Sequence, residues 1–141
     1  MRLPILTEVA VQLAQILQAN GFLTNLGEHL YYWRDLPFEY GEDGAISWAD
    51  AETTITQIGG ADEHRINLEI TAISFTDDPL TMGCSIAADL VQAIGNAATA
   101  FGQGLSASPM TLTTVVETKG KTAVRIVAEF ILTYRSGRYE I

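Results

Sequence analysis

The chain has 141 residues, a formal net charge of −9 and one cysteine, Cys84. This length fits a single domain, residues 1–141, which would bury about two thirds of the unfolded surface and needs no metal or disulfide to fold. The negative charge repels phosphate groups, so sequence-specific nucleic-acid binding and membrane binding are not expected. No apolar run is long enough to span a bilayer. A lone cysteine fits a reducing cytoplasm, and we expect its thiol to be buried.

Two helices are predicted. Apolar residues three or four positions apart predict the first over 7–19, with Asn20-Gly21 as its stop. Asp78-Pro79 predicts the start of the second, because Asp is a favoured N-cap residue and Pro is tolerated at the first helical position. This helix ends near Gly102, and its alanines form with Val91 a second, weakly apolar side. That side is a candidate contact with a neighbouring subunit, although packing inside one domain is the commoner reason.

Strands are predicted where apolar and polar residues alternate, which is the pattern of a strand with one buried face. Gly120 suits a tight loop between the last two strands. The predicted strands are 65–72, 110–116 and 124–134, with shorter β-rich segments at 30–33 and 53–58. Because helices and strands are segregated along the chain, we predict an α+β fold. Its mostly antiparallel sheet has about four or five strands, is packed by two helices and closes with a C-terminal hairpin.

Charge is distributed unevenly along the chain. Eight carboxylates and no Lys or Arg lie between Asp35 and Glu63, whereas five bases and two acids lie between Lys119 and Ile141. Two different, complementary surfaces on one chain build head-to-tail contacts, which close into rings or continue as filaments. We therefore expect an assembly protein, although acidic segments also serve simply as solvated surface. The predicted interface residues are Glu42, Asp43, Trp48, Asp50, Lys119, Lys121 and Arg125.

Residues 35–63 are predicted to form an acidic, aromatic loop. Its part from Leu36 to Ala51 combines turn residues and carboxylates with the large side chains of Leu36, Phe38, Tyr40 and Trp48. Tyr and Trp are frequent at the centres of protein interfaces, which favours a contact with a partner. The alternative is a loop that folds back onto its own core.

The sequence specifies no reaction. His29 and His64 lie in no motif that pairs them with a nucleophile or a second ligand. The acid pairs Glu42-Asp43 and Asp77-Asp78 have no third carboxylate at the spacing of a calcium site. We therefore predict no catalytic residue, no cofactor and no metal, and a protein that is not an enzyme.

Five features occur together over most of the chain: the opening helix, an aromatic-basic stretch that leads through Leu36-Pro37 into the acidic loop, an Ile-Asn-Leu-Glu-Ile strand, an alanine-rich helix and a final strand that ends in an aromatic residue. The aromatic-basic stretch is Tyr31-Tyr32-Trp33-Arg34, and the Ile-Asn-Leu-Glu-Ile strand is Ile66–Ile70. The alanine-rich helix covers Ile86–Ala98, and the final strand ends with Ile131–Tyr134. This layout resembles the tail terminator, or tail completion, proteins of long-tailed bacteriophages.

The resemblance implies a homo-oligomeric ring, usually a hexamer, at the head-proximal end of the tail in the virion, assembled in the host cytoplasm. Such a ring ends polymerisation of the tail tube and provides the surface to which the head docks. The implied partners are further copies of the chain, the tail tube protein and a neck or head-completion protein. Two alternatives stay open. One is another phage neck or head–tail joining protein, and the other is a small ligand-binding or hydrolytic domain with the aromatic loop as a pocket wall.

Overall fold

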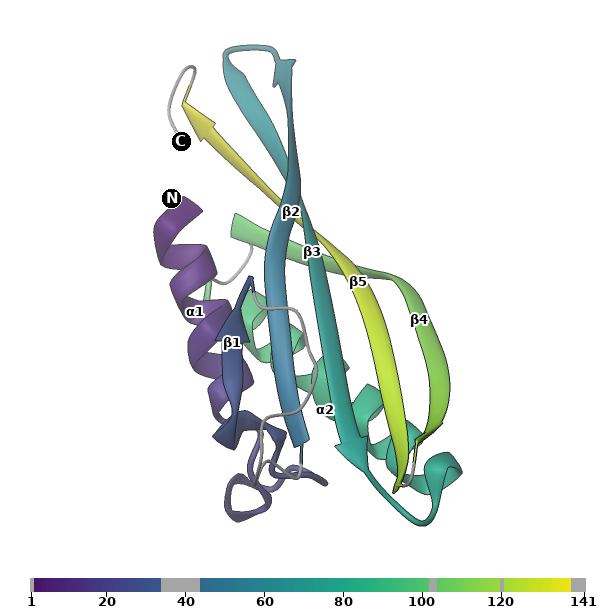
Figure 1. Ribbon diagram of the computed structural model, residues 1–141. Helices are drawn as coiled ribbons and strands as arrows, with labels where there is room; N and C mark the ends of the chain where they lie inside the picture. Colours follow the sequence, from purple (N-terminus) through teal and green to yellow (C-terminus); the bar gives the residue numbers. More distant parts are fainter. Residues whose placement is uncertain (1, 34–43, 102–103, 120, 138–141) are drawn as a thin grey trace.

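The computed structural model describes residues 2–33, 44–101, 104–119 and 121–137 (Figure 1). In this part of the chain, two α-helices accompany one five-stranded sheet. The helices are α1 (Arg2–Ala14) and α2 (Pro79–Ala100), and the short 3₁₀ helices η1 (Gln18–Asn20) and η2 (Leu26–Glu28) follow α1. The strands are β1 (Leu30–Tyr32), β2 (Gly44–Ile58), β3 (Ala61–Phe75), β4 (Leu105–Lys119) and β5 (Lys121–Gly137).

The sheet has the strand order β1-β2-β3-β5-β4. Only β1 is parallel to its neighbour, whereas β2, β3, β5 and β4 form antiparallel pairs. The β4–β5 hairpin closes the described fold, and β4 is an edge strand of the sheet. The predicted α+β fold, with a mostly antiparallel sheet, two helices and a closing C-terminal hairpin, is therefore confirmed.

Both helices lie against the same face of the sheet, which we call the helix side. Alternate residues of β3 and β5 point to this side, and they share one hydrophobic core with one stripe of each helix. Burial of an aliphatic side chain of this kind contributes about 1.5–3 kcal/mol relative to exposure. The core includes Ile66, Leu68 and Ile70 of β3, Ile126, Phe130 and Leu132 of β5, Ile5, Val9 and Leu13 of α1, and Ile86, Leu90 and Ile94 of α2.

Helix α2 begins where its sequence predicts. The carboxylate of Asp78 accepts a hydrogen bond from the backbone N–H of Thr81 at 3.3 Å, and Pro79 occupies the first helical position. This N-cap satisfies one of the amide groups that have no partner within the helix. Cys84 is exposed on α2, so the expectation of a buried thiol is wrong. Its neighbours Gly83 and Ile86 lie on the buried stripe, whereas Cys84 lies to one side of it.

The first helix is shifted from its predicted span of 7–19. It occupies Arg2–Ala14, and the chain then turns through η1, where Gly21 has a left-handed φ of 89°. Gly21 thus ends the short turn rather than the α-helix. Gly27 packs closely against the end of α1: its N–H donates to the carbonyl of Ile16 at 2.9 Å, and a Cβ there would lie 2.5 Å from the carbonyl oxygen of Ala14.

The predicted loop at 35–63 is wrong over residues 44–52 and 61–63, which belong to β2 and β3, whereas the β-rich segment predicted at 53–58 does lie in β2. Residues 34–43, including Glu42 and Asp43, lie outside the described part of the chain. Ile46 and Trp48 face the core, and the small residues beside them, Ala45, Ser47 and Ala49, are also buried. This continuous burial hides the alternation by which a strand is recognised. Strand β2 turns into β3 at Gly59-Gly60, where Gly59 has a positive φ of 61°.

A β-bulge divides β2 into two halves. Asp50 pairs with Leu68 and Glu52 with Asn67, so Ala51 is an extra residue. Beyond the bulge, Thr53–Ile58 and the facing residues Ala61–Ile66 form a hairpin that we call the arm. Figure 1 shows the arm extending past the N-terminal end of α1. The bulge brings odd-numbered residues of the arm onto the helix side, because Ile55 pairs with His64.

Candidate functional site

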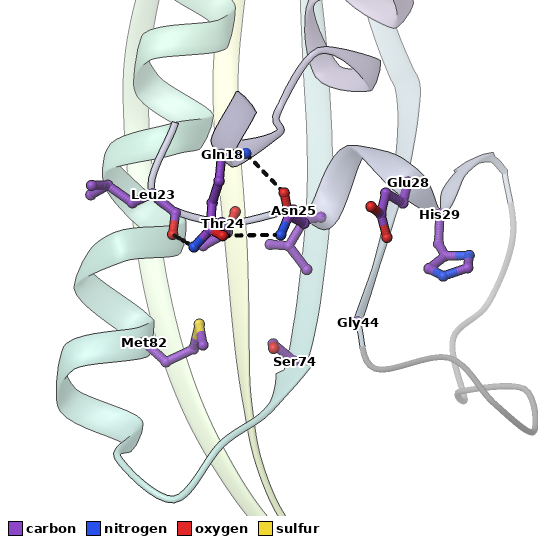
Figure 2. A pocket seen from close by; sticks show the side chains of 10 residues that line it. Gln18, Leu23, Thr24, Asn25, Glu28, His29, Gly44, Ser74 and Met82 are labelled. Carbon is purple, nitrogen blue, oxygen red and sulfur yellow. Dashed lines mark hydrogen bonds between the residues drawn. The ribbon is translucent and has the colours of Figure 1, made fainter. Parts of the chain in front are cut away.

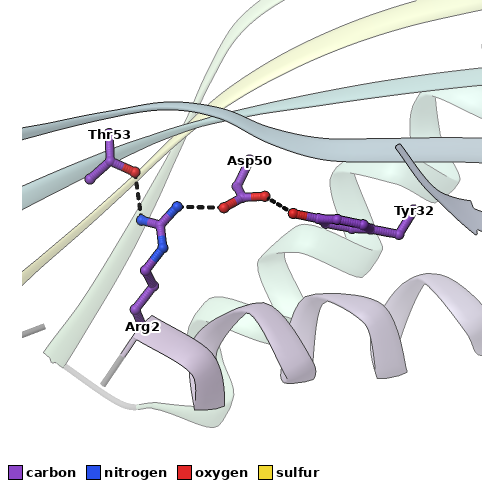
Figure 3. A network of polar contacts seen from close by, with 4 residues as sticks. All are labelled: Arg2, Tyr32, Asp50 and Thr53. Carbon is purple, nitrogen blue, oxygen red and sulfur yellow. Dashed lines mark hydrogen bonds and ion pairs between the residues drawn. The ribbon is translucent and has the colours of Figure 1, made fainter. Parts of the chain in front are cut away.

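Asp50, a predicted interface residue, is held by partners in its own chain (Figure 3). Its carboxylate forms an ion pair with the guanidinium of Arg2 and accepts a hydrogen bond from the hydroxyl of Tyr32. Arg2 also donates to the hydroxyl of Thr53. The Asp50 side chain is only 11 % exposed. The charge of Asp50 is therefore largely neutralised before any second copy approaches.

The environment of Asp50 affects two pKa values. Burial alone would raise the pKa of the Asp50 carboxyl, but the hydrogen bond from Tyr32 and the bond and charge of Arg2 outweigh it and hold the pKa below its usual value. The same hydrogen bond, together with partial burial, raises the pKa of Tyr32. The arrangement therefore favours a charged carboxylate and a protonated tyrosine.

Trp48 lies almost entirely within the core, with 6 % of its surface exposed. Its ring meets that of Tyr32 edge-on, with 4.9 Å between the ring centroids. The exposed aromatic residues described at this end of the sheet are Tyr32, 52 % exposed, and Trp33, which is 62 % exposed and has a positive φ of 57°. A contact of Trp48 with a neighbouring copy stays a prediction, and the structure gives Trp48 a packing role.

The predicted basic residues lie far along the sheet from Asp50. Arg125 of β5 is half-buried on the face opposite the helix side, where it pairs in register with Ile73 and Val115. The side chains of Lys119 and Lys121, at the β4–β5 turn, lie outside the described part of the structure. Asp50 and Arg125 are not in contact within one copy. A contact between two different copies does not require them to be. Their pairing between copies stays a prediction.

Another acid of the predicted acidic segment has basic neighbours of its own chain. Glu63 accepts from the Nε of Arg65 at 3.3 Å and lies 3.6 Å from the Nε of Arg135. Both arginines are largely exposed, so each pair contributes only about 0–1 kcal/mol. Even so, Asp50 and Glu63 show that acidic residues of this segment are partly compensated within one chain.

An apolar groove runs between α2 and the edge strand β4. It is lined by uncharged residues, namely Ala87, Ala88, Val91, Gln92, Gly95 and Leu112. Val91 is 39 % and Leu112 45 % exposed, and Val116 is exposed further along β4. Of the second side predicted for α2, Ala87, Ala88 and Val91 are therefore open to contact, whereas Ala93 and Ala97 are fully buried in the core. Sequence reasoning missed Leu112, because its exposure depends on where α2 crosses the sheet.

A polar pocket of about 270 Å³ lies beside the turns that follow α1 (Figure 2). Figure 2 shows Glu28 and His29 on one side, and Met82 and Ser74 on the other. Several lining groups bond to one another: the backbone N–H of Gln18 donates to the side-chain oxygen of Asn25 at 2.8 Å. This part of the lining therefore holds the turn in place.

The turn beside this pocket is anchored by a buried carboxylate on α2. Asp89 is 3 % exposed and accepts hydrogen bonds from the backbone N–H groups of Leu23 and Thr24, at 3.0 and 2.8 Å. The hydroxyl of Thr24 donates a third, at 2.7 Å. A buried charge is tolerated when hydrogen bonds replace its hydration. Asp89 thus fastens the turns between α1 and β1 to the middle of α2.

The two histidines lie in different settings. His29 borders the polar pocket, whereas His64 is fully buried in the sheet and stacks on Tyr134 with 4.6 Å between the ring centroids. The Nε2 of His64 is 2.7 Å from the hydroxyl oxygen of Ser136. Full burial makes His64 a packing residue of the sheet. Within the described part of the chain, no cluster of three or more His, Cys, Asp or Glu side chains is placed to hold a metal ion.

Comparison with known proteins does not assign the chain to a family. No family model matches it, and no curated protein matches it significantly. Neither described α-helix combines the length and apolar character needed to cross a membrane.

Proposed function

We propose that this chain is a structural protein of a long-tailed bacteriophage that assembles into a ring, a hexamer, at the head-proximal end of the tail tube. The ring ends tube polymerisation and presents the surface to which a neck or head-completion protein docks. The proposal rests on the resemblance of the sequence layout to tail terminator proteins. Three segments of that layout fall in regular secondary structure of the expected type: Ile66–Ile70 in β3, Ile86–Ala98 in α2 and Ile131–Tyr134 in β5.

The observation that carries an assembly role is the presence of two different open edges in one sheet. Among the residues that the structure describes, β4 is paired only with β5, and β1 pairs with β2 only at Ile46–Trp48, so the distal half of β2 lies at the opposite edge. Exposed strand edges are templates for pairing with another chain. A contact between two unlike surfaces is head-to-tail, and it closes into a ring when the rotation between copies allows.

Two other functions have some support. Another neck or head–tail joining protein would use the same open edges, so the fold alone does not favour one over the other. A small-ligand-binding domain is supported by the pocket that Glu28 and His29 border. Because part of the pocket lining bonds within the turn, the assembly role is the stronger proposal.

The test is the native mass and shape of the purified chain. Light scattering after size exclusion, over a concentration series, should give a discrete oligomer, and electron microscopy should show rings. Addition of the chain to polymerising tail tube protein of the same phage should shorten the tubes and place density at one end only. A chain that leaves tube length unchanged and binds no tube end would contradict the terminator role, even if it forms rings.

A further inference from the structure

The arm presents an uncharged strand edge to solvent. In a chain with net charge −9, no charged residue lies between Thr53 and Ile58. Ile55 is 51 % and Ile58 40 % exposed, and they point to opposite faces of the arm. Proteins usually protect exposed edges with charges, prolines or bulges. The bulge of β2 lies before this run, at Ala51, and the run itself contains no charge, proline or bulge.

The edge of β4 offers a run of matching length and chemistry. Thr111–Val116 also carries no charge, and it follows the Pro109 irregularity that interrupts the first part of β4. Leu112 and Val116 point to the helix side, because they pair with the buried Ala128 and Val124 of β5. The apolar groove of α2 and β4 lies directly beside Leu112. This edge therefore combines a free strand with an adjoining apolar groove.

We propose that the Thr53–Ile58 edge of one copy pairs with the Thr111–Val116 edge of the next, and that Ile55 seats in the groove between α2 and β4. Strand addition supplies main-chain hydrogen bonds, and alternate side chains supply specificity. Ile55 suits this place because it lies on the helix side of the arm, as Leu112 does on β4. The occupant of the groove is thus a second copy of this chain. This inference names the subunit contact of the proposed ring, and it therefore rests on the proposed function.

This contact differs from one held by charge. Asp50 and Glu63 already have basic partners in their own chain, whereas both edge runs and the groove lining are uncharged. Salt screens exposed charge pairs and has little effect on apolar burial and main-chain pairing. Assembly through the edges therefore persists at salt concentrations that would abolish a rim of ion pairs.

The first experiment substitutes Ile55→Lys in the full chain. Ile55 is half exposed in a single copy, so the variant should fold with an unchanged circular dichroism spectrum. Self-association should weaken by about tenfold or more, because a charge would enter the apolar centre of the contact. Leu3→Lys, at an exposed leucine of α1, is the matched control and should leave association unchanged. If Ile55→Lys lowers stability, Leu112→Lys tests the other side of the same contact.

The second experiment locates the contact by cross-linking. In a Cys84→Ala background, one chain carries Ile55→Cys and a chain of different tag length carries Leu112→Cys. A short bis-maleimide should join the two chains in the mixture and should join neither chain to itself.

A discrete oligomer that survives Ile55→Lys and shows no such cross-link overturns the edge contact and leaves the proposed ring standing. A chain that stays monomeric at every concentration overturns the contact as well, and the tube-length assay then decides the terminator role separately.

Discussion

Arg2 and Asp50, 48 positions apart in the sequence, form an ion pair that joins the first turn of α1 to β2 just before its bulge. The pair lies at the base of the arm, where Arg2 also bonds to Thr53. Helix α1 is thereby fixed to the strand from which the arm extends. This relationship and three others yield separate predictions.

Replacement of Asp50 by Asn should lower the free energy of unfolding by about 1–2 kcal/mol at neutral pH, because charged hydrogen bonds to Arg2 and Tyr32 are lost. The pKa of Asp50 is lower in the folded than in the unfolded chain, so its contribution is complete above the unfolded pKa and is lost as pH falls through the folded pKa. Urea unfolding should therefore show that the difference in free energy of unfolding between the unsubstituted protein and Asp50→Asn becomes smaller below about pH 4.

The control for that experiment is Glu52→Gln, an exposed acid on the same strand. It should leave the free energy of unfolding nearly unchanged at neutral pH. Equal stability losses in the two variants would contradict a specific role for the Arg2–Asp50 pair.

Replacement of Asp89 by Asn should destabilise the fold by about 2–3 kcal/mol, because an amide cannot accept all three hydrogen bonds from Leu23 and Thr24. Hydrogen exchange at the amides of Leu23 and Thr24 should rise in this variant. Asp77→Asn, at an exposed carboxylate before α2, is the matched control. Retention of slow exchange at both amides would argue against Asp89 as the anchor of the turn.

Replacement of Gly27 by Ala should destabilise the protein by about 1–3 kcal/mol, the usual cost of overpacking. The new Cβ would lie 2.5 Å from the carbonyl oxygen of Ala14, which is backbone and has little room to move. Gly60→Ala, where a Cβ meets nothing within 4 Å, should be close to neutral. Thermal unfolding of the two variants measures the difference, and similar melting temperatures would show that the end of α1 tolerates the extra atom.

Reversal of Lys119 and Lys121 to Glu should weaken self-association at low salt without lowering the stability of a single copy. The effect should be smaller than that of Ile55→Lys, because each rim ion pair contributes only about 0–1 kcal/mol. Sedimentation at low and high salt separates the two contributions. If the double reversal does not alter the oligomer distribution at low salt, charge pairing does not contribute to assembly.

The parts of the fold that were predicted correctly are those that local sequence determines. Asp78-Pro79 places the start of α2 because capping involves only neighbouring residues. The alternation in β3 and β5 is clear because one face of each packs on the helices and the other does not.

The first half of β2 could not be recognised in the same way. Small residues on its second face are buried together with Ile46 and Trp48, so polarity does not alternate. The bulge at Ala51 then shifts the period by one residue. Charge patterning likewise did not reveal that Asp50 would be held by Arg2, because that pairing depends on where α1 lies against the sheet.

The bulge at Ala51 has a consequence for how this molecule can vary in evolution. Because Ala51 is the extra residue, loss of its codon would leave Asp50 and Thr53 paired with Leu68 and Ile66, on the faces they now occupy. The local bend and added twist that bulges impose would disappear. The direction in which the arm leaves the body of the protein and the side chains it presents are therefore encoded separately. A single deletion would change the direction of the hairpin without changing which side chains it exposes on each face.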